Sequence, residues 1–309
     1  MTEALVVLAQ PGAAVAVRAS VADAPPLALV PPRAAPAADP APAGPPAAPP
    51  RVPASRPLPR ARRGTLAFLG HARQTPHVYL LADVDGTAIA AARAAAKARG
   101  TRLSWVSFVV KAAGDVLAEH PDAAAMFAEG PLRRWRPRLQ QPDTIAAKVL
   151  FDKSVDGQRC VASGVLRDVP GMDLDAVQAA LDDYKDAEIG PTGPFAGAHK
   201  LQRLPLPVIR LAYRAALMKP PVRNAVQGTF SVTSIGHTKV RTILPLISGT
   251  VGFGVGHVAD APVVRDGRLA VAPVLPLSLS FDHRVIDGAL ASQVLAEVKD
   301  RLDTWEQQS

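Results

Sequence analysis

The stretch LSLSFDHRVIDGALASQVL, residues 277–295, decides how the C-terminal part of the chain folds. Serine and apolar residues alternate up to Phe281, which is typical of a strand with one buried face. After Asp287, apolar residues return at helical spacing, so a helix is expected over 288–305. His283 therefore lies where a strand passes into a helix.

Ionisable side chains crowd this junction. His283 is flanked by Asp282 and Arg284, and Asp287 follows four positions later. A histidine here is either structural or a general base that works near neutral pH once neighbours fix its tautomer. At a helix start a carboxylate accepts backbone N–H bonds and pairs with a cation, so Asp287 is expected to organise the loop. Gly288 is expected to allow close backbone approach.

Composition bounds the domain organisation. The chain has 309 residues, of which 48% are apolar, enough for a sizeable core. The first 60 positions hold 15 of the 31 prolines and no aromatic residue. Such a segment buries too little apolar surface to offset its ordering entropy. We therefore predict a disordered Pro/Ala-rich linker over 1–57 and a single globular domain over 58–309.

Several classes of protein are disfavoured. Cys160 is the one cysteine, which suits a reducing cytosol and leaves a nucleophilic thiol as a minor alternative. No apolar run reaches the roughly 18 residues of a membrane span. The net charge of +8 comes largely from scattered arginines without a recognisable nucleic-acid module, although it could attract an acidic or phosphorylated carrier. No metal site is expected.

The periodicity predicts helices before strands. A short helix or turn is expected over 65–72. Helices are expected over 86–100, 104–120, 173–187 and 288–305, and strands over 77–85, 144–152, 158–166, 228–236, 250–258 and 274–282, with a hairpin over 261–273. This order favours an α+β fold. The basic amphipathic segment 201–221 is expected to pack against the domain, with a membrane surface or a partner as the alternative.

The motif PLSLSFDHRVIDGA resembles the active-site signature of the dihydrolipoamide acyltransferases, the core components of 2-oxoacid dehydrogenase complexes. RQTPHVYLLADVDGTAI, WVSFVVKAAGDVLAEHP and GTFSVTSIGH resemble other blocks of the family in the same order. The resemblance spans roughly 58–306, strongly after 226 and patchily over 121–225. It implies a chloramphenicol acetyltransferase-like two-layer fold, with helices on a mixed, largely antiparallel sheet.

The resemblance also implies residue roles. His283 would remove the proton from a thiol of coenzyme A or of a dihydrolipoyl arm, and the thiolate would attack a thioester. Thr233 matches the hydroxyl that stabilises the oxyanion, and Ser234 is the fallback. Asp287 would brace the loop, and Arg284 would be a salt-bridge partner. Coenzyme A enters as a substrate that carries the acyl group.

Assembly and partners are implied in the same way. The family's base and hydroxyl come from adjacent subunits of a trimer, so His283 of one subunit would face Thr233 of the next. No lysine precedes Lys97, so no covalent lipoyl group is expected here and an acyl donor on a lipoyl domain or carrier protein would act in trans.

Three functional hypotheses stay open. They are a stand-alone acyltransferase, a core or accessory subunit of a 2-oxoacid dehydrogenase complex, and a non-catalytic assembly subunit. The complete set His283, Thr233 and Asp287 disfavours the last. A condensation domain of peptide synthetases is a weaker relative, because its signature has a second histidine where this chain has Asp282. Acyl-chain and acceptor preference do not follow from the sequence.

Overall fold

The computed structural model describes residues 55, 57–128, 135–155, 157–265 and 267–305. The predicted linker over 1–57 lies almost wholly outside these residues. Apart from Ser55, the described residues belong to one compact unit that begins at Arg56.

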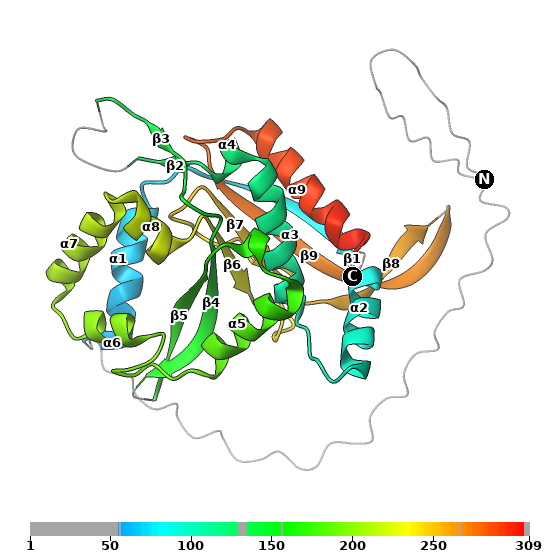
Figure 1. Ribbon diagram of the computed structural model, residues 1–309, viewed down its shortest axis with the longest axis horizontal. Helices are drawn as coiled ribbons and strands as arrows, with labels where there is room; N and C mark the ends of the chain where they lie inside the picture. Colours follow the sequence, from blue (N-terminus) through cyan, green and yellow to red (C-terminus); the bar gives the residue numbers. More distant parts are fainter. Residues whose placement is uncertain (1–54, 56, 129–134, 156, 266, 306–309) are drawn as a thin grey trace, which may run out of the picture. The chain divides into compact units, whose positions relative to one another are not determined.

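A seven-stranded mixed sheet forms the centre of this unit (Figure 1). Its order is β1-β9-β7-β6-β4-β5, and β8 pairs with β9. The β4–β6 and β6–β7 pairs are parallel and the others are antiparallel. The strands are β1 (His77–Asp85), β4 (Ala147–Val155), β5 (Gln158–Leu166), β6 (Phe230–Ser234), β7 (Val251–Val255), β8 (Ala259–Arg265) and β9 (Arg268–Asp282). The predicted α+β class with a largely antiparallel sheet is confirmed.

The long strand β9 corrects one prediction. The sequence predicted a hairpin ending at 273 and then a separate strand, but one strand runs from Arg268 to Asp282. Proline lacks only the N–H donor, and the Pro273 and Pro276 carbonyls still accept bonds from the backbone N–H groups of Gly86 and Gly256. One end of β9 pairs with β8 and the other with β1 and β7.

The β4–β5 turn is tighter than predicted. Pairing continues to Val155 opposite Gln158, beyond the predicted strand end at 152. Gly157 has a φ of 72°, the left-handed region that glycine enters at no steric cost. The turn therefore closes within very few residues, and β4 extends as far as the start of that turn.

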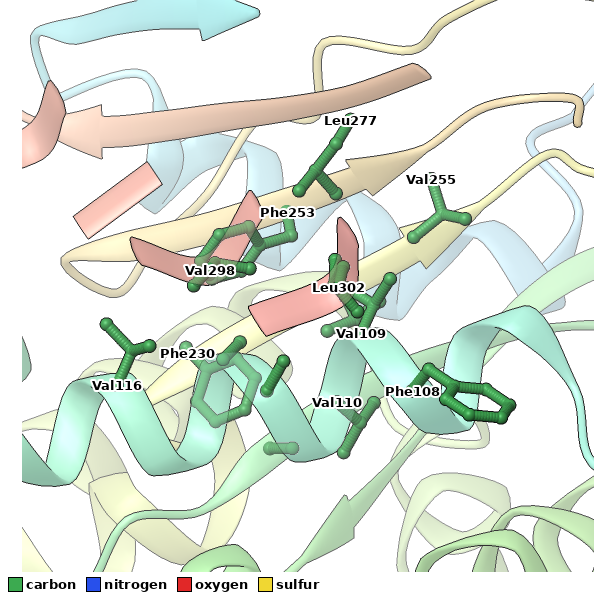
Figure 2. Packing of buried hydrophobic residues seen from close by; sticks show 14 of the residues in the cluster. Phe108, Val109, Val110, Val116, Phe230, Phe253, Val255, Leu277, Val298 and Leu302 are labelled. Atoms are coloured by element: carbon green, nitrogen blue, oxygen red, sulfur yellow. The ribbon is translucent and has the colours of Figure 1, made fainter. Parts of the chain in front are cut away.

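One face of the sheet is the hydrophobic core (Figure 2). It is covered by α3 (Trp105–Glu119), α5 (Leu174–Asp186) and α9 (Gly288–Asp303). Capping fixes where α3 and α5 begin: Ser104 Oγ accepts from the Ser107 N–H, and Asp173 Oδ1 from the Ala176 N–H. Buried apolar side chains of these helices meet alternate strand residues, among them Val109, Val116, Val298, Leu302, Phe230, Phe253 and Leu277.

The opposite face, here called the second face, has a different cover. Over β7 it is crossed by segment 241–247, which approaches so closely that a Cβ on Gly254 would lie 2.3 Å from the Ile243 carbonyl oxygen. Over β4, β5 and β6 it is covered by four helices, which line a cavity together with these strands. They are α1 (Arg63–Ala72), α6 (Ala196–Gln202), α7 (Leu206–Leu217) and α8 (Pro220–Gln227). The basic segment predicted to pack against the domain supplies α7.

The remaining elements are short or peripheral. They are η2 (Arg60–Arg62), α2 (Thr87–Ala98), α4 (Pro121–Ala124), β2 (Met126–Phe127), β3 (Leu139–Gln140) and η4 (Val169–Gly171). The pair β2–β3 forms a separate two-stranded sheet.

Candidate active site

His283 follows the last residue of β9 and is exposed. Its backbone N–H donates to the Pro76 carbonyl at 3.1 Å, which holds the turn against the start of β1. Its ring lies against Phe281, with centroids 5.4 Å apart. Within the described residues, no hydrogen bond to the ring nitrogens is present. The imidazole is therefore held by its backbone and an aromatic contact, and its nitrogens can reach a substrate or another subunit.

The neighbouring ion pair anchors the turn. Asp282 is buried, and its carboxylate accepts from Arg284 Nη2 at 2.6 Å and from Arg284 Nε at 2.9 Å. It also accepts from the Arg284 backbone N–H at 3.0 Å. The guanidinium stacks over Phe127, with 4.4 Å to the ring centroid. A buried carboxylate needs such a partner, so this pair fixes the backbone on both sides of His283.

Asp287 is the N-cap of α9. Its Oδ1 accepts from the Leu290 N–H at 3.0 Å, as a carboxylate at a helix start is expected to do. The cation next to the loop, Arg284, pairs with Asp282, two positions earlier in the same turn. The prediction for Gly288 is wrong for the single chain, because a Cβ there would meet nothing within 4 Å.

The candidate hydroxyls lie on β6. Since side chains alternate along a strand, Phe230, Val232 and Ser234 share one face, and Ser231 and Thr233 share the other. Phe230 and Val232 belong to the hydrophobic core, and Ser231 and Thr233 line the cavity. Ser234, the fallback for Thr233, instead accepts from the Gly236 N–H at 3.2 Å. Ser231 was missed, although the alternation in FSVTS pairs it with Thr233.

Strand register separates Thr233 from His283 within one chain. Thr233 aligns with Gly254 of β7, and Gly254 aligns with Ser278 of β9. Because a strand rises about 3.3 Å per residue, the positions from Ser278 to His283 cover roughly 16 Å along the sheet. Two strand spacings across the sheet add to this distance. A single chain therefore cannot bring its His283 to its own Thr233.

The cavity on the second face has a volume of about 660 Å³. Its floor consists of alternate residues of three neighbouring strands, among them Lys148, Leu150, Ser163, Val165, Ser231 and Thr233. Its roof is formed by α1, α6, α7, α8 and segment 246–249. The cavity thus extends from the candidate hydroxyl of Thr233 across β4 and β5.

Lys148 is the unusual group in this cavity. It lines the wall, and its ammonium lies 5.4 Å from the centroid of the Phe68 ring. No carboxylate is hydrogen-bonded or ion-paired to it among the described residues. Burial lowers the pKa of Lys148 to about 8, because the charged form is separated from bulk water. The sequence signal was a lysine inside the apolar run IAAKVLF, over 145–151, and its meaning was missed.

Polar contacts hold the roof in place. Gln227 Nε2 of α8 donates to Tyr213 Oη of α7 at 2.9 Å, and Tyr213 Oη lies 3.4 Å from Ser248 Oγ. Arg63 of α1 reaches the Leu204 carbonyl at 3.0 Å. These bonds link the roof helices to one another and to the loop beside β7.

Other candidate chemistry finds no support. Cys160 is buried, and burial followed by the nearby Asp152 carboxylate raises the pKa of its thiol, which disfavours the nucleophilic thiolate. Over the described ranges, no group of three or more histidine, cysteine, aspartate or glutamate side chains is arranged to hold a metal ion. None of the described helices is both long and apolar enough to cross a membrane.

Comparison with curated proteins finds relatives among acyltransferases. The chain is 25% identical over 256 residues to the dihydrolipoyllysine-residue acetyltransferase component of the pyruvate dehydrogenase complex of Staphylococcus aureus, covering 81% of this chain and 51% of that protein. It is 26% identical over 243 residues to the Bacillus subtilis protein of the same description, covering 77% and 47%. The chain thus spans about half the length of the curated relatives it matches.

Solved structures share the fold. A probable dihydrolipoamide acetyltransferase from Listeria monocytogenes superposes with a TM-score of 0.60 at 18% identity, covering 82% of this chain and 96% of that one. The Azotobacter vinelandii dihydrolipoamide acetyltransferase gives 0.59 at 25% identity, covering 81% and 91%.

The family model described as 2-oxoacid dehydrogenases acyltransferase (catalytic domain) matches residues 51–134 and 201–308. These ranges make up more than half of the chain. They include the cavity-facing hydroxyl of Thr233, the exposed imidazole of His283 and the helix cap Asp287. The chain therefore belongs to the 2-oxoacid dehydrogenase acyltransferase family, through its catalytic domain.

Proposed function

We propose that the protein transfers an acyl group between a thioester, such as an acyl-coenzyme A, and an acceptor, with His283 as the general base. The observation that carries the proposal is the family match over 201–308, which contains His283 at an exposed, braced turn. Bacterial relatives described as acetyltransferases support this reaction class. The single Cys160 favours a reducing cytosol as the place of action.

The proposed reaction begins with proton transfer. A ring nitrogen of His283 takes the proton of an acceptor thiol, and the resulting thiolate attacks the thioester carbonyl carbon. The carbonyl π electrons move to oxygen and form a tetrahedral oxyanion. When the oxyanion collapses, the carbon–sulfur bond to the original thiol breaks, and the leaving thiolate takes the proton from the imidazolium. The histidine is regenerated in each cycle.

We assign Thr233 as the donor to the oxyanion. It faces the cavity, and its hydroxyl is aimed away from the core. The Azotobacter vinelandii enzyme is described with a serine, a histidine and an asparagine in its catalytic mechanism, the last two four positions apart. His283 and Asp287 have the same spacing. The serine there precedes the histidine by 52 positions. That spacing leads to Ser231 here, whereas the motif register leads to Thr233, so Ser231 is the competing donor.

The site is proposed to form between subunits of a homotrimer. The separation of roughly 16 Å along the sheet between His283 and Thr233 supports a contribution from a second copy. Large apolar side chains are also exposed on the β8–β9 hairpin, where Val264, Leu269 and Val271 each keep more than 70% of their surface. Such patches mark association surfaces.

Subunit complementation tests the mechanism. The variants H283A and T233A should each lose activity, T233A by about tenfold to a thousandfold. When they are mixed as unfolded chains and refolded together, activity should return, since about one quarter of the interfaces then combine an intact His283 with an intact Thr233. A mixture no more active than the separately refolded variants would contradict a shared site.

Ser231 provides the matched control. If Thr233 is the donor, S231A should keep most of its activity, and a mixture of H283A with T233A should recover activity that T233A lacks. If Ser231 is the donor, S231A should lose activity and T233A should retain it. Acyl transfer is followed by mass spectrometry with a panel of acyl-coenzyme A donors and thiol, amine and hydroxyl acceptors.

A second candidate function is that of a subunit of a 2-oxoacid dehydrogenase complex that uses a lipoyl domain in trans. The relatives' description as components of the pyruvate dehydrogenase complex favours it. A separately purified, acylated lipoyl domain should then donate at a rate comparable to acyl-coenzyme A. Turnover with coenzyme A thioesters alone would favour the stand-alone enzyme.

A further inference from the structure

The cavity on the second face combines an apolar wall with one interior cation. Phe68, Phe195 and Ile209 line it from the roof, and Leu150 and Val165 line it from the floor. Phe68, Leu150 and Val165 are half-buried, so they present apolar surface to the cavity. Its volume of about 660 Å³ falls in the range of sites that enclose a drug-sized ligand. An acetyl group would fill only a small part of it.

The charges around this cavity are all of one sign. Among the described residues that line it, the charged side chains are Lys148 in the interior and Arg167, which is exposed. In the described part of the chain, no aspartate or glutamate lines it. Lys148 is half-buried. An ammonium partly withdrawn from water and without a carboxylate partner carries a desolvation cost, and an anion placed beside it would offset that cost.

Strand register links Lys148 to the proposed chemistry. Lys148 of β4 pairs with Ser231 of β6, and Thr233 follows two residues later on the same face. A strand spacing of about 4.8 Å and a rise of about 3.3 Å per residue place the two backbones roughly 8 Å apart. The Lys148 side chain extends from its backbone into the cavity, so the distance from its ammonium to Thr233 that a ligand has to span is shorter still. One small molecule can therefore contact the Lys148 ammonium and the Thr233 hydroxyl together.

We propose that this cavity binds an organic carboxylate with an apolar body, whose carboxylate pairs with Lys148 Nζ. This inference rests on the proposed function: the ligand is a substrate of the acyl transfer, and its reacting carbon or acceptor atom lies at Thr233. The carboxylate can belong to an acyl donor with a terminal acid group or to an acceptor acid. Lys148 is then the specificity determinant of this chain.

Calorimetric titration of the full chain tests the acceptor form without turnover. The probes are 4-phenylbutyrate and 4-phenylbutanamide, which share an apolar body and differ in charge. The wild type should bind the acid at least tenfold more tightly than the amide. K148M should bind both alike, and K148R should keep part of the preference. The exposed lysine Lys97 gives the matched control K97M, which should behave like the wild type.

The donor form is tested in the H283A background, where the thioester is not consumed. Octanoyl-coenzyme A is compared with the analogue that carries a terminal carboxylate on the same eight-carbon chain. A preference for the analogue that disappears in K148M/H283A identifies the carboxylate as part of the donor. A preference confined to the free acids identifies an acceptor.

Three outcomes would overturn the proposal. The first is equal binding within both pairs, the acid and the amide as well as the two coenzyme A thioesters. The second is a preference that survives in K148M, and the third is a covalent acyl adduct on Lys148, which would make it a nucleophile. Failure of the proposed function would be a separate result. If the complementation test showed no shared catalytic site, the binding ratios of acid to amide would still report on the cavity.

Discussion

The two faces of the sheet are built from the same strands, but one face packs into the hydrophobic core and the other lines a cavity. On the core face, Val149, Phe230 and Phe253 are buried against α3 and α9. On the second face, Lys148 and Thr233 line a cavity of about 660 Å³. Each is next in sequence to a core residue, Val149 and Val232 respectively. Because side chains alternate between the two faces, each strand stabilises the fold with one set of residues and contributes candidate functional residues with the other. Changes on the core face should affect stability, and changes on the second face and at the strand ends should affect function.

The largest effect should follow removal of the base. H283A should lower the turnover number by about 10² to 10⁴, the usual contribution of general base catalysis. The side chain is exposed and contacts mainly the Phe281 ring, so the melting temperature and assembly size should stay unchanged. Steady-state kinetics with light scattering and thermal melting check both parts. Unchanged turnover would refute the role of His283. If H283A also lost its assembly, the fall in turnover would be explained by the disrupted structure and not by the missing base.

The next effect compares truncations on the two faces. Phe253 is fully buried in the core, and F253A should lower the free energy of unfolding by about 3–5 kcal/mol. Leu150 borders the cavity on the second face, so L150A enlarges an existing space and should cost clearly less. Chemical denaturation of both variants at one subunit concentration measures the difference. Equal losses would mean that the cavity wall is packed as tightly as the core.

The cavity lysine should give a pH-dependent effect. Burial lowers the pKa of Lys148 from its ordinary 10.5 to about 8, so the unfolded state binds this proton more tightly than the folded state. The folded state therefore bears a cost of about 3 kcal/mol below pH 8, which fades as the pH rises toward 10.5. K148M lacks this group, so its stability advantage over the wild type should shrink over that interval.

Denaturation of the wild type and K148M at pH 7, 9 and 10 checks this expectation. Groups shared by the two proteins cancel in the difference. A difference that does not change with pH would mean that the Lys148 ammonium is hydrated in the folded protein.

The smallest effect concerns the helix cap. Asp287 accepts the Leu290 N–H at the start of α9. D287A should therefore destabilise the fold by about 1 kcal/mol, whereas D287N keeps a capping oxygen and should cost a few tenths of a kcal/mol. The Azotobacter vinelandii enzyme is described with an asparagine four positions after its histidine, so D287N should also retain most activity. Comparing thermal melts and turnover for both variants separates capping from charge.

Much of the fold followed from local patterns. The strand over 77–85 has the predicted bounds, and Ser104 caps the helix that its position predicted. Several strand bounds differed from the prediction: β6 and β7 are shorter than expected, whereas long-range pairing extends β9 and β4 through prolines and turn residues. Pairing partners lie far away in sequence, so a local window does not contain the information that sets a strand's end.

The candidate site was predicted unevenly. His283, Thr233 and Asp287 were proposed from the sequence because their motifs are contiguous, and their roles stay predictions. Lys148 was missed because its significance depends on helices more than 40 residues away in the chain, α1 before it and α6, α7 and α8 after it. Ser231 was visible in the alternation of FSVTS, but only the cavity distinguishes it from an ordinary strand serine.

The sequence by itself determined the α+β class, the strand-to-helix junction that carries His283 and the resemblance to the acyltransferase family, because these depend on periodicity and contiguous motifs. Tertiary structure alone decided which face of β4 and β6 is enclosed, and how far Thr233 lies from His283. Register and helix packing set those distances, and both arise from contacts between distant segments. The same contacts partly withdraw Lys148 from bulk water, and this burial lowers its pKa below the ordinary value for lysine.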